Sequence, residues 1–135
     1  MKRNYAKNGF ETAIAAPYFF DMPDYFRRSD LIISRAGATT CAELIASQKA
    51  SILIPFAKAA GDHQAHNSAA LKAIGGADVI LESEWKPELL AGKILCFLGH
   101  KDRISVMEKN LALLKKEAAA GPIAGLCFEL MDSGR

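Results

Sequence analysis

The stretch that most constrains the fold is an apolar run that passes through a glycine turn into a helical pattern. Residues 31–33 (Leu-Ile-Ile) are short and mostly β-branched and predict a buried strand, and residues 42–46 continue as a helix. A helix that starts directly after a strand and a glycine turn directs several unpaired backbone N–H groups outward. These donors and the helix dipole favour an anion such as a phosphate, although an ordinary capped helix produces the same pattern.

The polar residues of this stretch fit either interpretation. Gly37 allows the turn a positive φ or allows a ligand to approach the backbone closely. Thr39 or Thr40 can cap the helix or bind a phosphate oxygen. Glu43 lies one turn into the helix, where its carboxylate can accept hydrogen bonds from a sugar diol or remain solvated. Arg35 can clamp a phosphate or pair with a neighbouring acid, and the sequence favours neither.

The rest of the chain alternates short apolar runs with helical patterns. We expect strands over residues 12–16, 30–34, 51–54 and 77–81, and helices over residues 22–28, 39–47, 62–74, 103–120 and 123–131, with a further helix starting at Pro87. Such alternation is typical of parallel strands joined by right-handed crossovers. The predicted fold class is therefore α/β, a partial doubly wound, Rossmann-like parallel sheet of about four strands flanked by helices.

Composition narrows the classes of partner. Half of the residues are hydrophobic and the mean hydropathy is +0.07, which indicates a globular domain. A net charge of +2, without a stripe of basic and aromatic residues, argues against nucleic acid. Three cysteines without C-x-x-C spacing indicate reduced thiols in a cytoplasmic protein. His63 and His66 have no third ligand at zinc spacing, so we expect neither a metal nor a cofactor.

Two segments carry a resemblance to a known family. They are SDLIISRAGATTCAELIA (residues 29–46) and ILIPFAKAAGDHQAHNSAAL (residues 52–71). The spacing Arg-x-Gly-x-x-Thr-x-x-Glu, followed by Asp-His-Gln-x-x-Asn, resembles the nucleotide-binding half of the MurG family. Enzymes of that family transfer N-acetylglucosamine (GlcNAc) from UDP-GlcNAc to undecaprenyl-pyrophosphoryl-muramoyl-pentapeptide during peptidoglycan synthesis. The resemblance extends from about Phe10 to the C-terminus.

The resemblance implies roles for the matching residues in binding UDP-GlcNAc. It places the backbone at Phe19 against uracil and Glu43 at the ribose hydroxyls. It places Ala38, Thr39 and Thr40 at the diphosphate, in the same turn as Arg35 and Gly37. It places Asp62, His63 and Gln64 by the donor sugar. Gln64 is the strongest candidate for contact with a GlcNAc hydroxyl. From the residues alone, Asp62 also predicts the N-cap of its own helix, and we expect Asn67 to stabilise the loop.

The resemblance also implies what these residues do not supply. No nucleophile with an adjacent base is present, and the family transfers the sugar directly with inversion, using a base from its N-terminal domain. We therefore expect residues 1–135 to form a single, truncated nucleotide-sugar-binding domain of a two-domain glycosyltransferase, inactive alone. Full-length members are expected on the inner face of the cell membrane. The alternatives are a transferase of the same superfamily with another nucleotide sugar, or a non-catalytic α/β interaction module.

A last expectation concerns assembly. In the doubly wound order, the strands absent from this sequence lie between the predicted strands over residues 12–16 and 31–34. Their absence leaves the second of these strands as an open edge, which is a template for pairing with another chain. We expect self-association, most simply as a two-fold dimer, with a monomer whose N-terminal strand covers the edge as the alternative.

Overall fold

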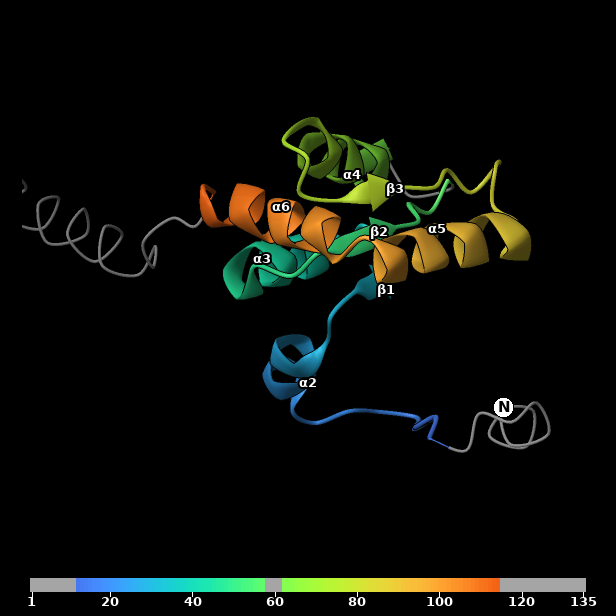
Figure 1. The fold of residues 1–135 in the computed structure, drawn as a ribbon. Coiled ribbons are helices and arrows are strands. Elements are labelled where there is room, and N and C mark those ends of the chain that lie inside the picture. The colour runs from blue at the N-terminus through green and yellow to red at the C-terminus, as the bar shows by residue number, and fades with distance from the viewer. Residues whose placement is uncertain (1–11, 58–61, 115–135) are drawn as a thin grey trace, which may run out of the picture.

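Three parallel strands and the helices that connect them make up the centre of the computed structural model, which describes residues 12–57 and 62–114 (Figure 1). Within these residues the strand order is β1-β2-β3, and both strand pairs are parallel. The elements in chain order are α2 (Met22–Arg28), β1 (Ile32–Ser34), α3 (Ala38–Ser47), β2 (Ser51–Leu53), α4 (His63–Ala73), β3 (Asp78–Val79), α5 (Pro87–Gly99) and α6 (Lys101–Ala112). The predicted α/β class with parallel strands and flanking helices is confirmed.

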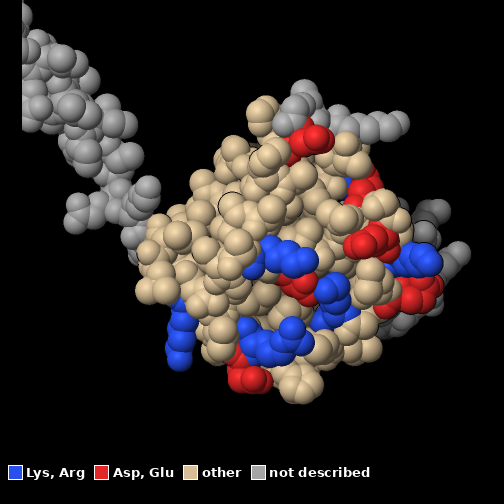
Figure 2. Space-filling view, turned by 90° about the horizontal axis from the view of Figure 1, so that it is seen from above, with Lys and Arg blue, Asp and Glu red and all other residues tan. Residues whose placement is uncertain are grey.

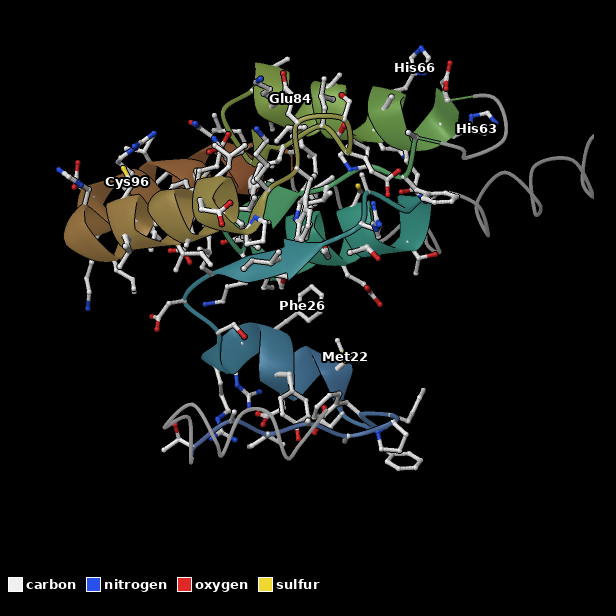
Figure 3. All side chains as sticks on the ribbon, turned by 90° about the vertical axis from the view of Figure 1, so that its right-hand side faces the viewer. Met22, Phe26, His63, His66, Glu84 and Cys96 are labelled. Atoms are coloured by element: carbon white, nitrogen blue, oxygen red, sulfur yellow. The ribbon has the colours of Figure 1, made fainter. Side chains whose placement is uncertain are left out.

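The central strand β2 fixes the two layers of helices. All three residues of β2 are buried, as expected of a parallel strand covered on both faces. Alternate side chains point to opposite faces, so Leu53 packs into one core and Ile52 into the other. Helices α3 and α4 cover the first face, whereas α5 and the start of α6 cover the second (Figures 1 and 3).

The two cores have different compositions. The core under α3 and α4 contains Phe26, Ala36, Cys41, Leu44, Leu53, Leu71, Ala77 and Leu111. The core under α5 and α6 contains Ala50, Ile52, Ile80, Phe97 and Met107. Burial raises the pKa of the Cys41 thiol in the first core, so this cysteine stays neutral over a wider pH range than a free thiol.

The register of the sheet brings its functional loops to one edge. Ser34 at the end of β1 pairs with Leu53 at the end of β2, and Leu53 pairs with Val79 at the end of β3. The chain leaves all three strands at this carboxyl edge. Ligands of open α/β sheets bind beyond such an edge, so the segments after Ser34, Leu53 and Val79 are where a site is expected.

One predicted strand is wrong. Residues 12–16 form no strand, and Ile14 within them is exposed. The apolar pattern is locally suitable for a strand, but an isolated strand has unpaired backbone groups and needs a neighbour. No strand of the described residues pairs with this segment, so the sheet has three strands there and not about four.

The other elements agree with their predictions to within a few residues where the structure describes them. Helix α2 begins and ends as predicted, with Asp21 as its N-cap accepting a hydrogen bond from the Asp24 N–H at 3.2 Å. Helix α4 ends before Gly75, as predicted, and Gly75 has a φ of 68° that favours glycine. Helix α6 begins two residues before the predicted start, and residues 115–131 of the predicted C-terminal helices lie outside the described residues.

The surface seen in Figure 2 carries basic and acidic side chains side by side, with a broad area free of both. In the described residues, every helix is too short or too polar to cross a bilayer.

Candidate functional site

The turn between β1 and α3 lies at the carboxyl edge of the sheet. Gly37 is the N-cap of α3, and no side chain makes a capping hydrogen bond there. The first turn closes when the Cys41 N–H donates to the Gly37 carbonyl at 2.9 Å. Of the two alternatives for Thr39 and Thr40, capping of the helix is not observed, because α3 already begins at Ala38 and both threonines lie inside its first turn.

Gly37 leaves the backbone of this turn accessible. Its φ is −65°, so the glycine is not needed for a left-handed conformation. A Cβ added there would meet only the Thr40 Oγ1, at 3.9 Å, so internal packing does not require glycine either. Of the two roles predicted for Gly37, close approach of a ligand to the backbone is the one compatible with this geometry. Ala38 and Thr39 are exposed, and the first N–H groups of a helix have no intrahelical partner. This helix start can therefore donate to an anion.

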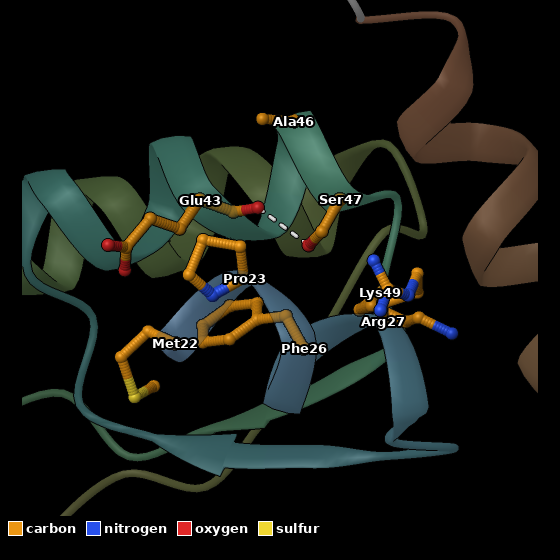
Figure 4. Close-up of a pocket in the computed structure, with 8 residues that line it drawn as sticks. All are labelled: Met22, Pro23, Phe26, Arg27, Glu43, Ala46, Ser47 and Lys49. Carbon is orange, nitrogen blue, oxygen red and sulfur yellow. Dashed lines mark hydrogen bonds between the residues drawn. The ribbon is translucent and has the colours of Figure 1, made fainter. Parts of the chain in front are cut away.

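Glu43 is exposed on α3 and lines a groove between α2 and α3 (Figure 4). The groove has a volume of about 560 Å³ and is lined by Met22, Pro23, Phe26, Arg27, Glu43, Ala46, Ser47 and Lys49. The carboxylate of Glu43 lies at one end, and the cations of Arg27 and Lys49 lie at the other. Glu43 is thus an acceptor on the helix whose start faces the carboxyl edge.

Arg35 takes part in a network that joins the three loops. Its guanidinium forms an ion pair with Glu82 at 2.9 Å, donates to the Ile54 carbonyl at 3.2 Å, and lies over the Phe56 ring at 5.5 Å from its centroid. Glu82 also accepts a hydrogen bond from the Ala57 N–H at 2.9 Å. Of the two alternatives predicted for Arg35, pairing with a neighbouring acid is present in this structure.

Two side chains of the Asp-His-Gln-x-x-Asn box form hydrogen bonds with the loops at the same edge. Gln64 Oε1 accepts a hydrogen bond from the Phe56 N–H at 2.9 Å. Asn67 Nδ2 donates to the Ala36 carbonyl at 3.1 Å, beside the glycine turn. The prediction that Asn67 stabilises the loop is confirmed. The two sequence motifs therefore lie together in space, although Ala36 and Asn67 are 31 positions apart along the chain.

The remaining residues of the box, Asp62, His63 and His66, lie at the start of α4. Asp62 is the N-cap of α4 by position, as predicted, but its side chain makes no capping hydrogen bond because its φ of 52° is left-handed. Its carbonyl instead contacts His66 Nδ1 at 3.1 Å. His63 and His66 are exposed and point outward from the start of α4 (Figure 3).

Comparison with known proteins identifies the family. The sequence profile described as the glycosyltransferase family 28 C-terminal domain matches residues 1–121. The chain belongs to this family. Two similar proteins, from Myxococcus xanthus and Caulobacter vibrioides, are both named UDP-N-acetylglucosamine–N-acetylmuramyl-(pentapeptide) pyrophosphoryl-undecaprenol N-acetylglucosamine transferase. The first is 42% identical over 131 residues, covering 97% of this chain, and the second is 38% identical over 124 residues, covering 92%.

A solved structure agrees with this assignment. The crystal structure of MurG from Acinetobacter baumannii superimposes with a TM-score of 0.77 at 26% sequence identity, over 91% of this chain and 37% of that one. The two curated relatives are covered over 34% of their length. The family 28 domain described here therefore spans about a third of the proteins that it resembles.

The remaining predicted site residue, Phe19, lies away from the glycine turn along the chain and has different contacts. Phe19 is half-buried before α2, with its ring packed edge-to-face on Tyr25 at 4.7 Å between centroids. The sequence-based prediction missed Glu82. The signal was present, since Glu82 follows β3 by three residues and so leaves the sheet at the same edge as Arg35 and Phe56.

Proposed function

We propose that this family 28 domain binds the donor UDP-GlcNAc for an inverting transferase that adds GlcNAc to undecaprenyl-pyrophosphoryl-muramoyl-pentapeptide. The observation that carries the proposal is the start of α3, where Gly37 leaves the backbone open and no side chain caps the helix. Unpaired N–H groups in this position suit the diphosphate of a nucleotide sugar. The names of the relatives and the solved MurG structure support the choice of donor and acceptor.

Most of the predicted residues contact the donor directly in this proposal. The N–H groups of Ala38, Thr39 and Thr40 bind the diphosphate, Glu43 accepts from the ribose hydroxyls, and the backbone at Phe19 pairs with uracil. Asp62, His63 and Gln64 lie by the hexose. As UDP leaves, negative charge grows on its diphosphate, and donors already in place at the helix start stabilise it.

The remaining parts of the reaction belong to the full-length enzyme. We assign the lipid-linked acceptor and the base that deprotonates its hydroxyl to the other domain of the transferase, and a peripheral position on the cytoplasmic face of the membrane to the whole enzyme. The 135-residue chain is then a nucleotide-sugar-binding domain without turnover of its own. Lipid-linked disaccharide formed by the pure chain would contradict this part of the proposal.

Calorimetry with UDP-GlcNAc, UDP-glucose and UDP tests the donor. We expect weak binding by the chain, with a dissociation constant near a millimolar, or about −4 kcal/mol. Glu43→Ala removes a charged acceptor and weakens binding by about 1–3 kcal/mol. Glu84→Ala is the matched control, because Glu84 is an exposed carboxylate on the loop after β3. Absence of binding by all three nucleotides favours the interaction module, and equal binding by Glu43→Ala and the parent refutes the ribose assignment.

We also propose that the chain self-associates through β1. Within the described residues β1 is an edge strand, with β2 on one side. The Ile32 N–H donates to the Ala50 carbonyl at 3.0 Å, and the Ser34 carbonyl accepts from the Ile54 N–H at 2.9 Å. Because alternate residues direct their backbone groups to opposite sides, those of Ile33 point away from β2. A second copy can pair with them.

Sedimentation at several concentrations up to about 100 μM, well above typical dimer constants, tests this assembly. Ile33→Lys places a charge on the edge, where Ile33 is 43% exposed, and should shift the chain toward monomer. Leu95→Lys is the control, because Leu95 is exposed on α5 and not on the edge. A parent that is monomeric throughout would exclude the dimer.

A further inference from the structure

Glu82 connects the loops that follow all three strands. It leaves the sheet just after β3, pairs with Arg35 from the loop after β1, and accepts a hydrogen bond from Ala57 in the loop after β2. Both distances are 2.9 Å. A carboxylate that receives a guanidinium and a backbone N–H together fixes the relative position of the two donors, since each bond restrains the other.

Arg35 is held by further contacts of its guanidinium. One nitrogen donates to the Ile54 carbonyl, and the charged group lies over the Phe56 ring. The Phe56 N–H in turn donates to Gln64, the residue proposed to face the hexose. A continuous set of contacts therefore runs from Glu82 through Arg35, Phe56 and Ala57 to Gln64.

The side chains in this network are only partly shielded from water. The exposed fraction is 51% for the Arg35 side chain and 32% for that of Glu82. An exposed ion pair adds little to global stability. We expect the network to affect the position of the loops, because most of its bonds join residues that are distant along the chain. These separations are 19 to 47 positions, and the exception is the local Phe56–Gln64 bond.

We propose that Glu82 is a positioning residue for the donor sugar. It acts through Arg35 and the Ala57 N–H on the loop after β2, whose Phe56 N–H holds Gln64 at the start of α4. This inference rests on the proposed function, since it assumes a nucleotide sugar at this edge. In this inference Arg35 holds the loops in position, and the N–H groups of α3 bind the diphosphate. Loss of Glu82 then affects the hexose more than the UDP moiety, which is held by the helix start and Glu43.

Three substitutions and two measurements test the proposal on the 135-residue chain. Glu82→Ala removes both bonds, Glu82→Gln keeps an acceptor but removes the charge, and Glu84→Gln is the control from the same loop. Amide hydrogen exchange at Ala57 reports on the loop without any ligand. Calorimetry gives the ratio of affinities for UDP-GlcNAc and UDP, which a loss of global stability alone does not change.

We expect Glu82→Ala to speed amide exchange at Ala57 by about tenfold, which corresponds to the loss of one hydrogen bond of about 1.4 kcal/mol. The affinity for UDP-GlcNAc relative to that for UDP should fall severalfold. Glu82→Gln should have a smaller effect on both, and Glu84→Gln none. Unchanged Ala57 exchange, or faster exchange with an unchanged ratio, would overturn the role of Glu82. If the parent binds neither nucleotide, the proposed function fails and the claim about the hexose with it, whereas Ala57 exchange still decides whether Glu82 orders the loop.

Discussion

The loops at the carboxyl edge and the segment around α2 are held in place in different ways. At the edge, bonds join Arg35 to Glu82, Ala57 to Glu82 and Ala36 to Asn67, all distant in sequence. Around α2, the hydrogen bonds and ring contacts of the described residues are local: Asp21 with Asp24, Ser29 with Tyr25, and Tyr18 with Phe20. The edge is therefore part of the cooperative fold, whereas α2 depends on its own turns and on one buried ring.

The difference concerns the parts of the donor that each region is proposed to hold. The diphosphate and hexose fall at the edge, where the backbone is fixed by long-range contacts. The nucleoside falls nearer Phe19, in a segment whose contacts are with α2. In the proposed site, long-range contacts therefore hold the loops at the reacting end of the donor, and local contacts hold the segment at the uracil end.

Leu44→Ala should break the rigid region most severely. Leu44 is fully buried on α3, in the core that includes Leu53 and Leu71. Loss of its side chain leaves a cavity and should lower the free energy of unfolding by about 2–5 kcal/mol. Urea denaturation followed by circular dichroism measures this loss. A change below about 1 kcal/mol would show that the core under α3 collapses around the cavity.

Phe26→Ala should separate the two regions. Phe26 is the buried residue of α2 and points from that helix toward the sheet (Figure 3). Its removal should cost about 1–3 kcal/mol, less than a phenylalanine in the centre of a core, because the rest of α2 already lies at the surface. Hydrogen exchange should show lost protection in α2 and nearly unchanged protection in β2. Equal loss in both would mean that α2 unfolds only with the whole domain.

Asp24→Asn tests the local contacts of α2. Asp24 forms ion pairs with Arg27 and Arg28, whose side chains are largely exposed. Such pairs are weak in water, so the loss should stay below about 1 kcal/mol and shrink further in salt. Thermal unfolding at low and high ionic strength measures it. A larger loss that persists in salt would mean that α2 is held by its charges and not by Phe26.

The smallest effect is expected from alkaline titration of Cys41. Burial raises the pKa of this thiol in the folded state, so its contribution to stability is complete below the unfolded pKa and is lost as the pH rises through the folded pKa. Unfolding free energies between about pH 8 and pH 10 should therefore fall less for Cys41→Ala than for the parent. The same slope in both proteins would assign the alkaline loss to other groups.

Local patterns predicted the parts of this structure that local forces determine. Helix α2, strand β1 and the helix stop at Gly75 follow from spacing and capping residues. Residues 12–16 have the composition of a strand, but pairing is a property of the neighbour and not of the segment. For the same reason, the sequence could place Arg35 at the edge without deciding which group it pairs with.

The candidate site was predicted as a set of residues and not as a set of contacts. The glycine turn and the Asp-His-Gln box do meet at the carboxyl edge, as the motifs indicated. The sequence left the conformation of Gly37 open and did not indicate the left-handed φ of Asp62, because both depend on how the loop enters its helix. Glu82 was missed because no motif marks it; only the parallel register brings it to Arg35.

The hydrogen bond from Asn67 to the Ala36 carbonyl has a consequence for evolution. Ala36 is fully buried, so loss of Asn67 removes a partner from a carbonyl in the core, at a cost of about 1–3 kcal/mol. Selection on folding alone therefore links the two motifs, whichever sugar the protein uses. Among divergent descendants, we expect the glycine turn and this asparagine to be inherited together, and chains that have changed their donor to retain both.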